Sequence, residues 1–146
     1  MAMTMELYSN LYSGMLENNF ADLTGAAAIS CALLTEDKAI AFDRGHVNIT
    51  SVETYEVDDQ VQTDYARQDL TGVNVDVTGA VITLDAADLS FGATVTLTAK
   101  AAVLFAKADG RLIAFIDFGE ERATAGTLFE IKWHANGIFK TTIQTE

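Results

Sequence analysis

Histidines and paired carboxylates are the side chains of this sequence that could bind a metal ion. The two histidines, His46 and His134, lie far apart, and the His-x-His spacing of cupin-type metal sites is absent. Asp43 precedes His46 in the stretch FDRGH, which we interpret as a hydrogen-bonded turn rather than a two-ligand site. Asp58 and Asp59 lack the spacing of an EF-hand loop, so we interpret them as a solvated acidic turn. The sequence therefore predicts no metal and no cofactor.

Nucleophilic catalysis has no recognisable pattern in this sequence. The Gly-x-Ser-x-Gly elbow and the glycine-rich phosphate loops are both absent. The 21 acidic residues guarantee a carboxylate pair in any fold, so they do not indicate a glycoside hydrolase. Cys31 is the single cysteine, which excludes an internal disulfide, and its neighbours in AAAISCALL predict a buried, unreactive thiol. We assign no catalytic residue and expect a protein that is not an enzyme.

The charge and the composition limit the partners that we expect. Nine basic residues against 21 acidic ones give a net charge of −12, and no cluster of Lys and Arg could bind phosphates. We therefore expect no direct binding to nucleic acid. No apolar run approaches the roughly 20 residues of a membrane helix. The start, MAMTMELYSN, has no basic region before an apolar segment, which favours folding in a cytoplasm.

The first third of the chain predicts one helix, one strand and a long irregular segment. Residues 4–20 carry apolar side chains at helical spacing, with Thr4 as the expected N-cap. Residues 26–35 read as a buried strand. Residues 36–64 are polar and acidic with scattered apolar positions, and a connection of this length often has a function. They either contain short strands or form a loop or arm that reaches a neighbouring molecule.

The remainder of the chain predicts β-structure. Valines alternate with polar residues over 73–78, and Gly79 permits a turn into a second strand. Odd-numbered residues from 95 to 105 are all apolar and are expected to share one face. A last hairpin is expected around Asn136-Gly137, with a bulge at Gly137. Short strands, regular turns and the absence of proline predict one domain over residues 1–146, an antiparallel β-sandwich of jelly-roll type with one N-terminal helix.

The stretch KAAVLFAKADGRLIAFID, residues 100–117, predicts a hairpin that is apolar on both faces. Asp109-Gly110 suits a two-residue type I′ turn, which sets Phe105 opposite Ala114 and Leu104 opposite Phe115. A strand pair that is apolar on both faces needs a cover on each. The N-terminal helix could supply the second cover, or a like subunit could do so in a dimer or trimer. The second alternative gives these candidate interface residues: Ala102, Leu104, Ala106, Ile113, Phe115, Tyr8 and Tyr12.

The order of landmarks along the chain resembles that of small virion structural proteins of tailed bacteriophages. The helical start leads into ALLT at 32–35, and YARQDL, AADLSF, TLTAKAAVLF, GRLIAFIDFG and GTLFEIKWHANGIF follow at 65–70, 86–91, 96–105, 110–119 and 126–139. The resemblance spans nearly the whole chain, and its landmarks are strands and turns rather than a chemical signature.

The resemblance implies a jelly-roll-like sandwich that acts without catalysis as a capsid cement or decoration protein. Its implied partners are the major capsid protein and copies of itself, on the exterior of a virion assembled in the host cytoplasm. Relatives of this kind also occupy the neck or the tail, so an accessory protein at either position is an alternative. A further alternative is a surface adhesin that binds host glycans through exposed aromatic rings, for which Tyr55 and Tyr65 are the candidates.

Overall fold

A computed structural model describes residues 3–17, 22–58, 62 and 64–142 of the chain. The fold is mainly β, and all strand pairs among the described residues are antiparallel. The main sheet has five strands in the order β1-β8-β7-β2-β3. Their bounds are Thr4–Leu7 (β1), Leu112–Thr127 (β8), Val95–Ala106 (β7), Ile29–Leu34 (β2) and Gln68–Asp69 (β3).

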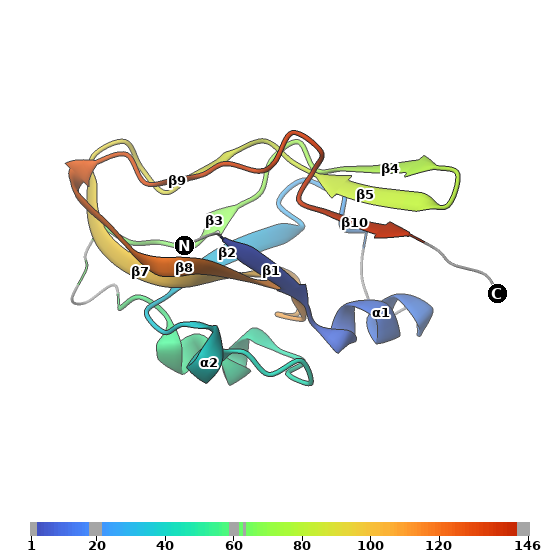
Figure 1. Cartoon of the computed structure of the whole chain (residues 1–146), viewed down its shortest axis with the longest axis horizontal. Helices are drawn as coiled ribbons and strands as arrows, with labels where there is room; N and C mark the ends of the chain where they lie inside the picture. Colours follow the sequence, from blue (N-terminus) through green and yellow to red (C-terminus); the bar gives the residue numbers. More distant parts are fainter. Residues whose placement is uncertain (1–2, 18–21, 59–61, 63, 143–146) are drawn as a thin grey trace.

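Two smaller sheets and short helices complete the fold. One sheet has the order β10-β5-β4, with bounds Phe139–Thr142, Val81–Asp85 and Asn74–Thr78, and the other pairs β6 (Leu89–Ser90) with β9 (Glu130–Ile131). The helices are α1 (Ser9–Leu16) and α2 (Lys38–Ala41), with 3-10 turns η1 (Ile49–Ser51) and η2 (Glu53–Tyr55). Figure 1 shows β9 above the main sheet, α2 below it, and α1 with the β4–β5 hairpin at one end. The expected mainly β, sandwich-like class with a helix near the N-terminus is confirmed.

The hairpin of β7 and β8 forms as expected, but its turn and register differ from the prediction. Ala106 N–H donates to Arg111 O and Gly110 N–H donates to Ala106 O, so four residues form the loop. Gly110 has a φ of +79°, whereas Asp109 has no positive φ, which excludes the type I′ turn. Leu104 consequently lies opposite Ala114 rather than Phe115, a shift of one residue.

Register shifts between β7 and β8 change which residues of β7 point to each face of the main sheet. The ladder shifts between Ala99 and Ala101 and again between Leu104 and Phe105. Leu97 and Ala99 therefore pack in one core cluster, and Ala101 packs in the other. The expectation that all odd residues from 95 to 105 share a face is wrong, because a β-bulge reverses the alternation of side chains.

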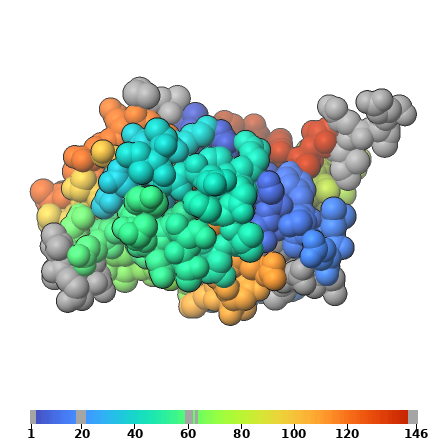
Figure 2. Space-filling model, turned by 90° about the horizontal axis from the view of Figure 1, so that it is seen from below, coloured from blue at the N-terminus to red at the C-terminus, as the bar shows by residue number. Residues whose placement is uncertain are grey.

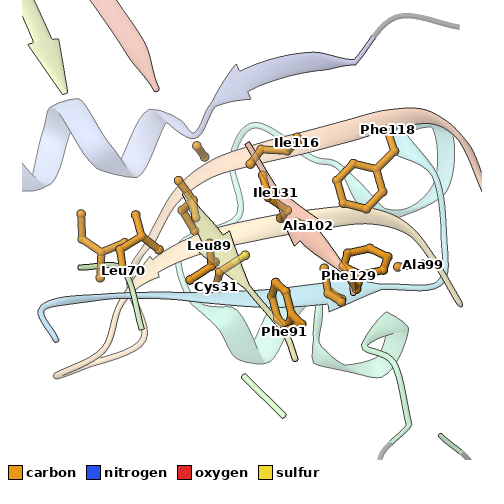
Figure 3. Packing of buried hydrophobic residues seen from close by; sticks show 14 of the residues in the cluster. Cys31, Leu70, Leu89, Phe91, Ala99, Ala102, Ile116, Phe118, Phe129 and Ile131 are labelled. Carbon is orange, nitrogen blue, oxygen red and sulfur yellow. The ribbon is translucent and has the colours of Figure 1, made fainter. Parts of the chain in front are cut away.

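The first core cluster lies between the main sheet and the β6–β9 layer. Figure 3 shows Leu89 and Ile131 from this layer above Cys31 and Ala102 of the main sheet. The Phe129 ring meets Phe91 edge-on at 5.9 Å between centroids. β2, predicted as a buried strand, is buried at each of its six positions. Close packing of this kind accounts for one covered face of the hairpin.

Residues 38–57 cover the other face of the main sheet. Their apolar side chains pack in the second cluster, whose buried members are Tyr8, Ala32, Leu34, Ala41, Ile49, Val52, Ala101, Val103, Phe105, Leu112 and Phe115. Figure 2 shows this segment spread across the underside of the molecule. Ile49 N–H donates to Gly110 O at 2.7 Å, and Val57 N–H donates to Leu33 O at 2.9 Å. The described part of the segment is therefore neither a set of strands nor an arm, but a helical cover held to the chain's own sheet.

The N-terminal region begins as a strand rather than as the helix predicted over 4–20. β1 pairs with β8 from Thr4 opposite Asp117 to Leu7 opposite Ala114. α1 then follows, and Tyr8 is its N-cap residue without a side-chain cap bond. The helical prediction was therefore wrong for 4–7 and right for 9–16, and residues 18–20 lie outside the described residues. Pairing with β8 stabilises a strand that local propensity does not favour.

The expected C-terminal hairpin does not form as two paired strands. Gly137 N–H donates to His134 O at 2.9 Å, which confirms a tight turn at Asn136. However, β9 pairs with β6, whereas β10 pairs with β5. The turn thus directs the chain from one sheet to another.

Candidate functional site

The structure places most of the candidate interface residues inside the molecule. Ala102, Leu104 and Ile113 are fully buried, and Phe115 is 1% exposed. Tyr8 is fully buried and Ala106 is 3% exposed, whereas Tyr12 is 41% exposed. The chain itself covers both faces of the hairpin, mainly through residues 38–57 rather than through the helix. The apolar second face therefore gives no reason to expect a subunit over it, and six of the seven candidates form no exposed surface.

The face by which α1 packs also differs from the apolar stripe in the sequence. Its buried residues are Asn10, Leu11 and Gly14, and Met15 and Leu16 are exposed at 52% and 88%. The Asn10 amide donates to Leu112 O and to Val47 O, both at 3.1 Å. These two bonds satisfy backbone carbonyls of β8 and of the covering segment, which makes an asparagine the anchor of the helix.

The chemistry-bearing residues of the sequence do not converge. Among the described residues, no group of three His, Cys, Asp or Glu side chains could hold a metal ion. His46 N–H donates to Asp43 O at 3.0 Å, which is the turn expected in FDRGH. His134 lies in an exposed turn, where its Nδ1 accepts from Asn136 N–H. Cys31 is buried as expected, and burial raises the pKa of its thiol, which keeps it protonated.

A surface pocket of about 590 Å³ between η2 and residues 65–67 contains a charged cluster. The Arg67 guanidinium donates to both Glu56 oxygens at 2.7 Å and lies 5.3 Å from the Phe105 ring centroid. The Tyr65 hydroxyl donates to Glu56 Oε1 and accepts from Leu33 N–H. Burial and the Glu56 carboxylate raise the pKa of Tyr65. Through these contacts Glu56, which follows η2, is linked to Leu33 of β2 by Tyr65 and to Phe105 of β7 by Arg67.

The two tyrosines considered for glycan binding do not stand free. Tyr65 is 6% exposed and stacks near Phe91, with 6.3 Å between ring centroids. Tyr55 is partly buried against the second core cluster. Sugar binding by stacking needs an accessible aromatic face, so the expectation that these rings are available is wrong for Tyr65.

Two elements at one end of the molecule, α1 and β4, each carry exposed apolar side chains. We use the name α1–β4 surface for Tyr12, Met15 and Leu16 of α1 with Val75 and Val77 of β4. Val75 is 43% and Val77 65% exposed. Figure 1 shows both elements at the end that carries the β4–β5 hairpin. The Tyr12 hydroxyl lies 3.0 Å from the Thr141 hydroxyl of β10, so α1 contacts the edge of the three-stranded sheet opposite to β4. Exposed apolar side chains on two elements at the same end make this end a candidate for contacts with other proteins.

Charge is distributed unevenly between this end and residues 36–64, the longer stretch that includes the covering segment. Residues 36–64 contain eight acidic and two basic residues, a net charge of −6 out of −12. The elements α1, β4, β5 and β10 carry only Asp76, Asp85 and Lys140, a net charge of −1. The α1–β4 surface therefore lies on the part of the molecule where repulsion of an acidic partner is weakest.

No family model, no curated protein and no solved structure matches this chain. No helix in the described part of the chain is both long enough and apolar enough to cross a membrane. Of the features of this end, the apolar alternation of β4 was visible in the sequence. The role of Asn10 was not, because an asparagine within an apolar helical stripe gives no sequence signal of two long-range bonds.

Proposed function

We propose that the chain is a non-enzymatic structural protein of a tailed-bacteriophage particle, acting as a capsid cement or decoration protein. The order of its landmarks supports the proposal, since TLTAKAAVLF and GRLIAFIDFG supply much of β7 and β8. The partners under this proposal are the major capsid protein and further copies of the chain, and its location is the capsid exterior. It is assembled there after folding in the host cytoplasm.

The observation that carries the proposal is the α1–β4 surface beside a closed core. A cement protein acts by burying surface between neighbouring subunits, and each Å² of apolar surface removed from water contributes about 25 cal/mol. Met15 and Leu16 are available for this purpose, because α1 packs through its other face. Residues 36–64, with a net charge of −6, suit the outside of a shell that contains DNA, because they do not attract phosphates.

The proposal is tested by binding to particles. Antibodies against the purified chain, applied to phage particles from the source cell, should label the head surface in electron micrographs. Label on the neck or tail assigns the accessory role at that position instead. Particles without any label contradict the proposal.

Two matched surface variants test the role of α1 in that binding. Leu16→Asp with Met15→Asp should abolish binding to capsids that lack the protein, because both side chains project from the α1–β4 surface. Ile40→Asp is the control, since Ile40 is 60% exposed on the cover formed by residues 38–57, away from this surface. Equal binding by both variants and the wild type would show that α1 does not contact the particle.

A further inference from the structure

We propose that two copies of the chain pair through the free edges of their β4 strands, antiparallel and centred on Val75, so that the two three-stranded sheets become one six-stranded sheet. Self-association of this kind does not depend on the proposed function, because it concerns the purified chain alone.

The β4 strand is an exposed edge with an apolar face. It pairs only with β5 among the described residues, and all five of its positions are exposed. The β4–β5 ladder sets Val75 opposite Leu84, and Phe139 of β10 lies opposite Leu84 on the other side. An apolar row thus crosses all three strands and stops at the free edge. Such edges pair with other strands unless something blocks them.

The backbone of β4 directs hydrogen-bonding groups to that edge. In an antiparallel ladder, pairs that exchange hydrogen bonds alternate with pairs that do not. The hairpin turn has two residues, Gly79 and Ala80, which makes Thr78 and Val81 the closing hydrogen-bonded pair. We infer that Val73, Val75 and Val77 present their N–H and C=O groups to the free edge.

The sequence VNVDV, residues 73–77, is complementary to itself when two copies pair antiparallel, which favours a second copy of the chain as the partner of this edge. A two-fold axis that relates two antiparallel strands passes midway between one residue and its own copy. With the axis at Val75, each Val73 faces Val77 of the other copy, and each Asn74 faces Asp76 of the other copy. The amide of asparagine donates to a carboxylate, so these pairs are complementary in charge and hydrogen bonding. An axis at Asp76 is excluded, because Asp76 directs its N–H and C=O groups toward Thr83 of β5.

The charge distribution favours the same occupant. A chain with a net charge of −12 repels its copies over most of its surface, but α1, β4, β5 and β10 together carry only −1. In the Val75-centred register the apolar row runs without interruption from Phe139 through Leu84 and Val75 into the second copy. In the monomer the row ends at the exposed side chain of Val75. In the dimer, Val75 of one copy packs beside Val75 of the other, so the two rows form one continuous row.

Sedimentation velocity of the purified chain tests the pairing. We expect a monomer–dimer equilibrium between about 1 µM and 1 mM, because a single strand pair is a small interface. Asn74→Asp creates two Asp–Asp pairs across the axis and should weaken the dimer about tenfold or more. Asp76→Asn leaves neutral Asn–Asn pairs and should change the dissociation constant by no more than about threefold.

The double variant Asn74→Asp with Asp76→Asn identifies the register. It exchanges the members of each complementary pair, so the dimer should recover to within about threefold of the wild type. Asn136→Asp adds the same charge at an exposed turn outside β4 and is the matched control. Circular dichroism and thermal melting confirm that each variant is folded.

Two results would overturn the proposal. The first is a wild-type chain that stays monomeric at every concentration tested. The second is a dimer that Asn74→Asp leaves unchanged, or that the double variant fails to restore. Particle labelling in either case still reports separately on the proposed function.

Discussion

At the scale of single residues, buried polar groups determine how the covering segment is held. Glu56 illustrates this, since one carboxylate accepts hydrogen bonds from both Arg67 and Tyr65. The Tyr8 hydroxyl is the opposite case, because it is buried without a hydrogen-bond partner among the described residues. Neither arrangement is visible in the sequence, where Glu56 is one of many acidic residues and Tyr8 belongs to an apolar stripe.

Removing the charge of Glu56 should destabilise the protein more than removing the charge of Glu53. Glu56→Gln should lower the free energy of unfolding by about 1–3 kcal/mol, because the buried Tyr65 hydroxyl and the Arg67 guanidinium lose a charged acceptor. Glu53→Gln is the matched control, since Glu53 is half exposed and lies 3.6 Å from Arg67. We expect the control to change stability by less than about 0.5 kcal/mol in urea unfolding. Similar losses in both variants would show that the Glu56 contacts are not the anchor.

Removing the Tyr8 hydroxyl should leave the protein at least as stable at neutral pH. Tyr8→Phe removes no hydrogen bond, so we expect the free energy of unfolding to change by less than about 1 kcal/mol or to rise. Unfolding in urea at pH 7 is the measurement. A loss well above that range would mean that the hydroxyl has a partner, such as a buried water.

The pH dependence of stability provides a second test of Tyr8. Burial raises the pKa of Tyr8 above its usual value near 10, so above that pH the unfolded chain releases a proton that the folded chain keeps. Stability should therefore fall as the pH rises above about 10. Tyr8→Phe should make this fall shallower, and Tyr65 and Cys31, whose pKa values burial also raises, should account for the remainder. An unchanged alkaline slope would contradict burial of Tyr8.

At the scale of elements, the strands were predictable where alternation or continuous burial is strong. β2, β4 and β5 lie within the expected residues, and the β7–β8 hairpin forms where it was expected, although β8 continues beyond Asp117 to Thr127. The hairpin register and the face change at Ala99–Ala101 were not predictable, because a bulge adds a residue without altering the apolar composition. The cover was missed because its apolar residues belong to one-turn helices, which are too short to show a period.

Gly110 joins the hairpin turn to the cover and should be sensitive to substitution. A Cβ there would lie 2.8 Å from Asn48 Oδ1 and 3.0 Å from Ile49 Cγ2, in addition to a φ of +79°. Gly110→Ala should therefore lower the free energy of unfolding by about 2–4 kcal/mol. Gly79→Ala is the control, because Gly79 has a φ of +61° with nothing within 4 Å. It should lose only about 1 kcal/mol, and an equal loss at both sites would show that η1 does not pack on the turn.

At the scale of the whole molecule, the cover and the α1–β4 surface have different roles. Residues 38–57 close the core and belong to a longer stretch, residues 36–64, that carries half of the net charge, whereas the nearly neutral end leaves apolar side chains exposed. The expectation of an assembly surface arose from the hairpin, yet that hairpin is enclosed within one chain. The surface offered for assembly lies instead on α1 and β4.

The net charge predicts how salt affects self-association. Two copies that each carry −12 repel one another, and salt screens this repulsion, whereas the β4 contact is mainly apolar and backbone. Raising the salt from about 0.05 M to 0.5 M should therefore tighten the dimer. Sedimentation equilibrium measures the effect. A dimer that loosens with salt would indicate a contact dominated by opposite charges.

Hydrogen exchange of the purified chain, compared between dilute and concentrated solutions, tests most directly whether one chain covers both faces of its own main sheet. Amides of β7 and β8 around Val103 and Phe115 should be strongly protected in dilute monomer and should not change with concentration. Amides of β4 should exchange quickly when dilute and gain protection as the chain associates. Fast exchange of β7 and β8 in the monomer, with protection gained only on association, would contradict this description.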